Sequence, residues 1–283
     1  MPPVLIDGVA VATRIRAQIK ADVDILKSQN KRPPCLAVIL VGDDPASQIY
    51  VANKEKACVD AGILGRSVRL PIDTTQEVLL DVINDFNNDP SVDGILLQLP
   101  IPKHLNRDEA VAAIAAKKDV DGLTPENQGH LIWKHDCLVA CTPLGIMELM
   151  REYKVNIAGK VAVVMGRSIL VGGPTATLLS NAGATVISVH SGTVDPKQWT
   201  KLADIVVVAT GVHHILRADW VKPGAVVIDV GIHRRDGKLS GDVCFDEVAP
   251  LASMITPVPK GVGPMTIAML LSNCLKAYRK SII

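Results

Sequence analysis

The chain alternates between short apolar runs and amphipathic stretches, and this alternation limits its possible folds more than any other feature. Continuous apolar runs of this length suit strands that are buried on both faces of a parallel sheet. We expect such strands at residues 36–41, 94–97, 161–165, 185–189, 205–209 and 226–230. Helical patterns lie between them, at residues 9–29, 45–61, 75–87, 109–116, 143–153, 174–181 and 266–280. The sequence therefore predicts an α/β fold.

The length of 283 residues suggests about two domains, at roughly 150 residues each. A fresh strand–loop–helix unit begins near residue 159, and proline and glycine cluster at 256–264. The last helix is too long to be a frayed tail. We expect it to return to the first domain, so that residues 1–142 and 265–283 form one domain and residues 143–264 the other.

The charge balance argues against nucleic-acid and membrane partners. There are 30 basic and 29 acidic residues, and aromatic residues make up 3%, so neither a basic surface nor base stacking is favoured. The first residues do not resemble a signal peptide, and no apolar stretch reaches the roughly 18 residues of a membrane span. The six cysteines include no CxxC pair, so we expect no metal site. These features predict a cytoplasmic protein.

A glycine-containing loop follows the expected strand at 161–165 and precedes a helix. Gly166 would let backbone approach a ligand closely, and Arg167 and Ser168 suit phosphate oxygens. The spacing is not GxGxxG, and a merely tight turn is the alternative reading. The strand at 185–189 ends near Ser191 without the acidic residue typical of NAD sites. A serine would tolerate a 2′-phosphate, which favours NADP, although Ser191 could also be an ordinary turn residue.

The helix at 45–61 carries Tyr50 and Lys54 on one face, where they could position a substrate and a proton-transfer amine. Gln98 stands at the carboxyl end of an apolar strand, where open α/β sheets build sites. Asp121 could accept paired hydrogen bonds from an amino-pyrimidine edge. Each signal is weak alone: a surface tyrosine beside a solvated lysine is common, and Asp-Gly usually forms turns. Short-chain dehydrogenases use a similar Tyr–Lys pair, but there the nucleotide loop comes first.

Taken together, these motifs resemble one family, the bifunctional methylenetetrahydrofolate dehydrogenase/methenyltetrahydrofolate cyclohydrolases. The resemblance runs in order over nearly the whole chain and is carried by residues 50–54 (YVANK), 96–100 (LLQLP), 118–122 (KDVDG), 141–143 (CTP), 166–168 (GRS), 228–232 (IDVGI), 256–259 (TPVP) and 261–266 (GVGPMT). It implies an N-terminal α/β catalytic domain that binds folate and a Rossmann-like NADP-binding domain. It also implies a homodimer.

The resemblance implies two reactions on tetrahydrofolate derivatives. NADP would take a hydride from 5,10-methylenetetrahydrofolate, and water would then open the methenyl product to 10-formyltetrahydrofolate. Lys54 would be the central catalytic residue, supported by Gln98, with Tyr50 stacked on the folate ring and Asp121 on the pterin edge. The other implied contacts are Gly166, Arg167, Ser168, Ser191 and Ile232 for NADP, and Pro259, Gly261, Val262 and Gly263 beside the folate.

The sequence departs from the family pattern at a few positions. Lys260 stands where glycine is usual, which could alter its loop or add charge. His213 and His214 replace a polar turn, and His233 replaces a common asparagine. Two other functions stay open at this point, a dehydrogenase without the hydrolase step and a non-catalytic NADP-binding protein. Retention of Lys54 and Gln98 argues against the first, and the joint presence of Tyr50, Lys54, Gln98 and Asp121 argues against the second.

Overall fold

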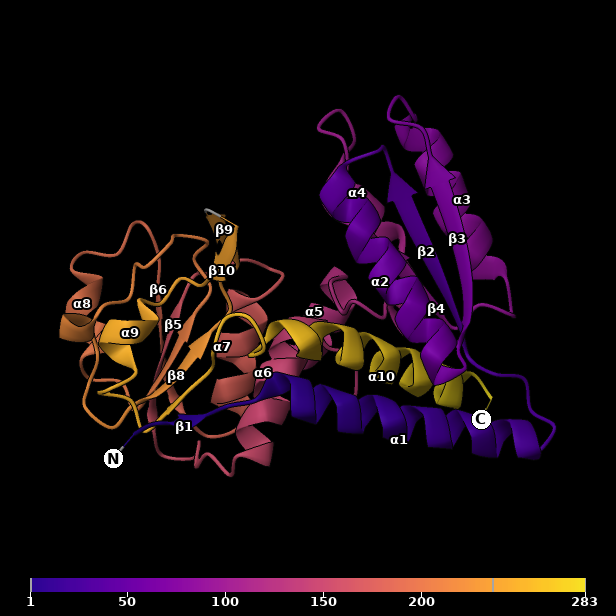
Figure 1. Ribbon diagram of the computed structural model, residues 1–283. Helices are drawn as coiled ribbons and strands as arrows, with labels where there is room; N and C mark the ends of the chain where they lie inside the picture. Colours follow the sequence, from indigo (N-terminus) through magenta and orange to yellow (C-terminus); the bar gives the residue numbers. More distant parts are fainter. Residues whose placement is uncertain (1, 236, 283) are drawn as a thin grey trace. The chain divides into compact units, whose positions relative to one another are not determined.

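The computed structural model describes residues 2–235 and 237–282, which divide into two compact units (Figure 1). The six-stranded unit comprises the segment that ends at Thr13 together with Thr142–Thr266. The three-stranded unit comprises Arg14–Cys141 and the segment from Ile267 onward. The chain therefore passes from one unit to the other at three places. The expected division differs in one respect, because it assigned the N-terminal segment to the same domain as residues 14–142.

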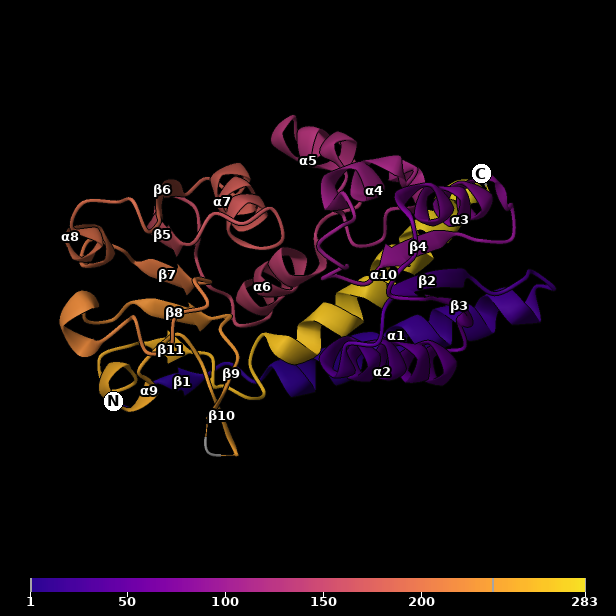
Figure 2. The same ribbon diagram turned by 90° about the horizontal axis from the view of Figure 1, so that it is seen from above.

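A parallel sheet in the order β1-β11-β8-β7-β5-β6 forms the six-stranded unit. Helices α6 and α7 lie on one face of this sheet and α8 and α9 on the other (Figures 1 and 2). β7 and β8 are buried throughout, as expected for apolar runs inside a parallel sheet. The elements are β1 (Val4–Leu5), β5 (Val161–Met165), β6 (Thr185–Val189), β7 (Ile205–Val208), β8 (Val226–Asp229), β11 (Met254–Ile255), α6 (Cys141–Glu152), α7 (Gly172–Asn181), α8 (Pro196–Thr200), η2 (Ala218–Trp220) and α9 (Phe245–Val248).

Two further features of this unit were not expected. A hairpin of β9 (His233–Arg235) and β10 (Lys238–Ser240) follows β8. The N-terminal strand β1 pairs with β11, and this pairing is why the first residues belong to this unit. The strand order places a switch point between β5 and β7, where the neighbouring connections leave in opposite directions. Ligands bind at such points in open α/β sheets.

The three-stranded unit is a parallel sheet with β2 at its centre, in the order β3-β2-β4. Helix α2 lies on one face of the sheet and α3 and α4 on the other (Figure 2). Every residue of β2 is buried. The elements are α1 (Gly8–Ser28), β2 (Cys35–Val41), α2 (Pro45–Ala61), β3 (Leu64–Leu70), α3 (Gln76–Asn88), β4 (Gly94–Leu97), α4 (Arg107–Ala113), η1 (Ala116–Lys118), α5 (Pro125–Ile132) and α10 (Gly263–Ser281), of which α1 and α10 begin in the other unit.

Local sequence explains where α2 begins and ends. The Asp44 side chain accepts a hydrogen bond from Ser47 N at 2.8 Å, and Pro45 occupies the first helical position. Gly62 ends the helix in the left-handed region. The predicted start and end of this helix are therefore confirmed.

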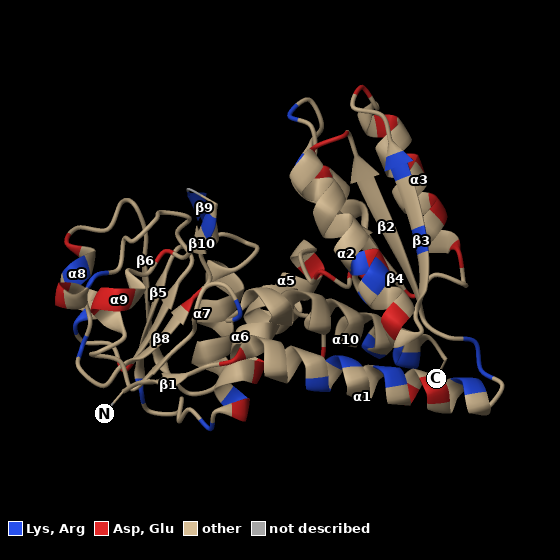
Figure 3. Ribbon diagram, in the orientation of Figure 1, with Lys and Arg blue, Asp and Glu red and all other residues tan. Residues whose placement is uncertain are grey.

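The charged residues of the long helix α1 have both signs, with Arg14, Arg16 and Lys20 followed by Asp22 and Asp24 and then by Lys27 (Figure 3). Such mixing is typical of a solvated helix face. Among the described residues, no helix combines the length and the apolar character needed to cross a membrane.

Candidate functional site

In the three-stranded unit, Lys54 and Gln98 are in direct contact. Lys54 Nζ, on α2, donates a hydrogen bond to Gln98 Oε1 at 2.9 Å. Gln98 follows β4 and is 7% exposed, and its Nε2 donates to Leu99 O at 2.7 Å. Both ends of the amide are therefore held. The half-buried ammonium of Lys54 has three hydrogens to donate, so two remain for a substrate or a water molecule.

Asp121 lies close enough to Lys54 to interact with it electrostatically. Burial raises the pKa of the Asp121 carboxyl above its usual value, and the nearby Lys54 ammonium opposes this shift. The turn that holds Asp121 requires glycine at the next position: Gly122 has a φ of 68°, and a Cβ there would lie 2.3 Å from the carbonyl carbon of Val139. Asp121 is thus fixed beside the lysine by the backbone.

Tyr50 lies one helical turn before Lys54 on α2 and is 51% exposed. The structure therefore brings Lys54, Gln98 and Asp121 together, with Tyr50 on the same helix.

Cys141 also belongs to this group, although the sequence motif gave it no role. Its buried thiol interacts with Asp121 and donates to Val120 O at 3.3 Å. Asn273 of α10 donates to Val120 O and to Val139 O, both at 2.8 Å. These contacts tie α10 to the turn that carries Asp121. Only the motif CTP could have signalled the cysteine.

In the six-stranded unit, a cavity of about 530 Å³ lies at the switch point of the sheet. Gly166 follows β5 with a φ of 107°, and a Cβ there would lie 2.2 Å from Ala209 O. At Gly172, where α7 begins, a Cβ would lie 2.1 Å from Gly166 O. Backbone therefore packs here more closely than any side chain allows, and the cavity wall opens at the N-terminus of a helix, as phosphate groups prefer.

The residues of this cavity suit a phosphorylated nucleotide. Gly166, Arg167, Ser168 and Ser191 all line it. Arg167 and Ser168 are exposed, so their donors are accessible. The residues after β6, from His190 to Thr193, include no carboxylate that would repel a 2′-phosphate.

Ile232 lines a second, smaller cavity of the same unit instead. This cavity, of about 290 Å³, also contains Pro259, Gly261, Val262 and Gly263. Asp229 contributes a buried carboxylate to its wall. Burial raises the pKa of Asp229 to about 6, although backbone N–H groups of Val243, Asp242 and Gly231 oppose the shift. Ile232 and the loop at 259–263, expected to contact different ligands, thus share one cavity.

Comparison with known proteins decides the family. The sequence model described as "Tetrahydrofolate dehydrogenase/cyclohydrolase, catalytic domain" matches residues 6–121, and that described as "Tetrahydrofolate dehydrogenase/cyclohydrolase, NAD(P)-binding domain" matches residues 140–282. The chain belongs to the tetrahydrofolate dehydrogenase/cyclohydrolase family. The expected resemblance is confirmed, and with it the two-domain α/β fold and the dehydrogenase and cyclohydrolase activities.

Relatives within the tetrahydrofolate dehydrogenase/cyclohydrolase family match this chain over nearly its whole length and theirs. The bifunctional protein FolD of Streptococcus agalactiae is 51% identical over 279 residues, covering 98% of each chain. The FolD structure from Campylobacter jejuni has a TM-score of 0.96, with 48% identity and 98% of each chain covered. The FolD structure from Trypanosoma brucei, "complexed with NADP cofactor and inhibitor", has a TM-score of 0.95 and 40% identity, covering 100% of this chain and 99% of that one.

Three of the departures from the family pattern cluster around Asp242 of the six-stranded unit. The His213 and His214 rings stack at 3.6 Å, and the His233 ring meets His213 edge-on at 5.4 Å. His233 Nε2 lies 2.8 Å from Oδ1 of the fully buried Asp242. The other oxygen of Asp242 accepts from Thr210 and Gly211. His233 thus contacts a carboxylate that holds the backbone of the loop after β7, and His213 and His214 stack beside it.

The fourth departure, Lys260, adopts a φ of 86°. This region favours glycine, because a side chain there is strained. The conformation explains why glycine is the usual residue of the family at this position. The loop keeps the glycine-type backbone even though lysine occupies it.

Proposed function

We propose that Lys54, Gln98, Tyr50 and Asp121 carry out the folate chemistry of this enzyme, with NADP as its cofactor. The proposed reactions are oxidation of 5,10-methylenetetrahydrofolate to the methenyl form and hydrolysis of that product to 10-formyltetrahydrofolate. The observation that carries the proposal is the 2.9 Å hydrogen bond from Lys54 Nζ to Gln98 Oε1. It fixes the Lys54 amine, which also interacts electrostatically with the Asp121 carboxyl group, in the unit that does not contain the nucleotide cavity.

Lys54 is proposed to move protons during hydrolysis. In its neutral form, the Lys54 amine would take a proton from the water molecule that adds to the methenyl carbon, and it would return a proton to the ring nitrogen as the ring opens. Gln98 would position the amine, since its own amide is fixed through Leu99 O. Asp121 would accept hydrogen bonds from the amino-pyrimidine edge, and Tyr50, half exposed on the same helix as Lys54, would stack on the ring.

NADP, when bound, supplies the redox chemistry by accepting the hydride from the methylene carbon. Gly166 and Gly172 are proposed to let the backbone approach its phosphates, with Arg167, Ser168 and Ser191 as donors. Ile232 is proposed to contact the cofactor, and Pro259, Gly261, Val262 and Gly263 the folate. Their shared cavity supports the idea that the two ligands meet there.

The preference for NADP over NAD is supported by the residues around the larger cavity. A charge-assisted hydrogen bond from Arg167 or Ser191 to a 2′-phosphate contributes about 1.5–3 kcal/mol. NADP should therefore bind roughly ten- to a hundredfold more tightly than NAD. Steady-state kinetics with each cofactor measures this preference, and equal or better kcat/KM with NAD would contradict it.

The role of Lys54 is tested by comparing Lys54→Met with Lys56→Met. Lys56 is an exposed lysine on the same helix, so its replacement controls for loss of a charge. Loss of methenyl absorbance measures hydrolysis without NADP, and NADP reduction measures oxidation. Lys54→Met should lower hydrolysis by about 10²–10⁴-fold and oxidation less, whereas Lys56→Met should change neither. A folded Lys54→Met enzyme with normal hydrolysis would remove Lys54 from the mechanism.

We also propose that the protein is a cytoplasmic homodimer. The edge strand β6 and the adjoining helix α8 support a self-association surface, because Val194 and Leu202 are exposed apolar side chains next to them. Sedimentation velocity at micromolar concentration measures the oligomeric state. A monomer under these conditions would contradict the proposal.

A further inference from the structure

A third cavity lies in the three-stranded unit, away from the residues proposed for folate chemistry. Its volume is about 570 Å³, and its wall includes Arg32, Asp93, Lys117, Lys118 and Lys280. Arg32 and Asp93 precede the amino ends of β2 and β4, whereas Gln98 follows the carboxyl end of β4. Asp93 and Gln98 stand on either side of that extended strand, which separates them by about 16 Å at roughly 3.3 Å per residue.

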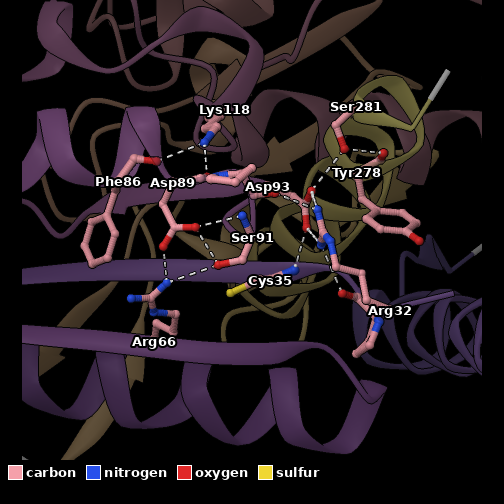
Figure 4. A network of polar contacts seen from close by, with 12 residues as sticks. Arg32, Cys35, Arg66, Phe86, Asp89, Ser91, Asp93, Lys118, Tyr278 and Ser281 are labelled. Carbon is pink, nitrogen blue, oxygen red and sulfur yellow. Dashed lines mark hydrogen bonds and ion pairs between the residues drawn. The ribbon is translucent and has the colours of Figure 1, made fainter.

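The only carboxylate in the wall of this cavity, as far as the chain is described, is already satisfied. The Asp93 side chain is 1% exposed and receives Arg32 Nη1 at 2.6 Å and Nη2 at 2.8 Å. Cys35 N and Ser281 Oγ donate to the same carboxylate, at 2.8 and 3.1 Å (Figure 4). Asp93 therefore forms its ion pair with Arg32, and it interacts with Lys118 only electrostatically, without direct contact.

Lys118 is a buried cation without a counter-ion. It is 8% exposed and donates to two carbonyl oxygens at the end of α3, Phe86 O at 2.9 Å and Asp89 O at 2.7 Å (Figure 4). Within residues 2–235 and 237–282, no carboxylate lies within ion-pair distance of it. The Asp89 carboxylate is instead paired with Arg66 and Ser91. One of the three ammonium hydrogens of Lys118 is left without an acceptor.

Neighbouring cations add to this positive charge. Burial, followed by the Lys117 ammonium, lowers the pKa of Lys118, and the carboxylates of Asp89 and Asp93 oppose this shift. Lys117 is exposed and has no ion pair in the described part of the chain. Lys280 shares a single carboxylate, Asp136, with Lys276. Among the described residues, the basic side chains that line the cavity therefore outnumber the carboxylates that pair with them.

The role of Lys118 in capping α3 explains its two carbonyl contacts, but not the open cavity or the two further lysines. We propose that this cavity binds a small organic phosphate. A phosphate group would contact Lys117 and Lys118, which provide charge-assisted donors. The volume lies in the range of small-molecule sites and exceeds the need of one phosphate. Val92 and Ile282 provide an apolar wall for the organic part.

The test uses the full-length protein saturated with NADP, so that the phosphate-binding loop after β5 is filled. Isothermal titration calorimetry with ribose 5-phosphate, inorganic phosphate and succinate compares an organic phosphate, a bare phosphate and a dicarboxylate. We expect one saturable site for ribose 5-phosphate, with weaker binding of the other two anions. No saturable binding, or equal affinity for inorganic phosphate or for succinate, would overturn the assignment.

Matched variants locate the binding. Lys117→Ala removes an exposed lysine from the cavity, and Lys20→Ala removes one from α1, where it pairs with Asp24. Lys118 itself is left unchanged because its loss would uncap α3. Lys117→Ala should weaken ribose 5-phosphate binding about threefold or more, and Lys117→Ala with Lys280→Ala more than about tenfold. Affinities equal to that of Lys20→Ala would overturn the proposal, and thermal unfolding of each variant verifies that it is folded.

Discussion

A close backbone approach in the nucleotide loop makes Gly166→Ala an informative substitution. A methyl group there would lie 2.2 Å from Ala209 O, whereas real Cβ contacts essentially never fall below 3.0 Å. The two backbone segments must therefore separate, although both are hydrogen-bonded to the sheet, Gly166 N to Val189 O and Ala209 N to Met165 O, each at 2.8 Å. The φ of 107° adds about 1–2 kcal/mol for an L residue, and the overlap adds about 1–3 kcal/mol.

Gly159→Ala separates these two costs. Gly159 also has a positive φ, 75°, but an added methyl group would meet nothing within 4 Å. This variant should lose only the backbone part, about 1–2 kcal/mol, and bind NADP normally. Gly166→Ala should lose about 2–5 kcal/mol in urea unfolding and about 100-fold in NADP affinity, as its phosphate donors are displaced. Equal stability of the two variants, or normal NADP binding by Gly166→Ala, would refute the close-approach reasoning.

Three further predictions concern single side chains. The pKa of Asp229 is about 6 in the folded state, against 3.8 for an ordinary aspartate, so the folded state binds this proton more tightly and the free energy of unfolding should fall by about 3 kcal/mol as pH rises between these two values. Asp229→Asn should remove this pH dependence of the unfolding free energy, measured by urea titration at several pH values. An unchanged pH dependence would contradict the assignment. Asp121→Ala should weaken folate binding far more than NADP binding in calorimetry, and unchanged folate affinity would leave Asp121 only a turn former. Lys260→Gly should raise the free energy of unfolding by up to about 1 kcal/mol, because it relieves the strain at φ 86°; a loss of stability would show that the lysine side chain makes a compensating contact.

The central strands could be predicted from the sequence because they are continuous apolar runs. β2 is buried throughout and was predicted one residue short at its start. Its neighbour β3, Leu64–Leu70, was missed, because an edge strand needs no apolar run and this one carries Arg66, Ser67 and Arg69. Helix α5 was also missed: its eight residues are too short to show a clear helical period.

Individual site residues could be found from motifs, but their grouping could not. Lys54 and Gln98 were predicted as partners only through the family resemblance, and their hydrogen bond joins positions 44 residues apart. The cavity at 32, 117–118 and 280 had no sequence signal, since its basic residues come from three separate segments of the chain. Charged residues that are far apart in the sequence and close together in the fold do not form a recognisable sequence motif.

Because the chain passes between its two units three times, each unit needs segments that are made at different times during synthesis. β1 is made first, yet its partner β11 appears only at Met254–Ile255. The three-stranded unit likewise waits for α10, which supplies the buried side chains of Cys274, Leu275 and Tyr278. An exposed strand edge therefore persists until β11 has been made, and an uncovered apolar surface persists until α10 has been made, so neither unit can be completed early in synthesis.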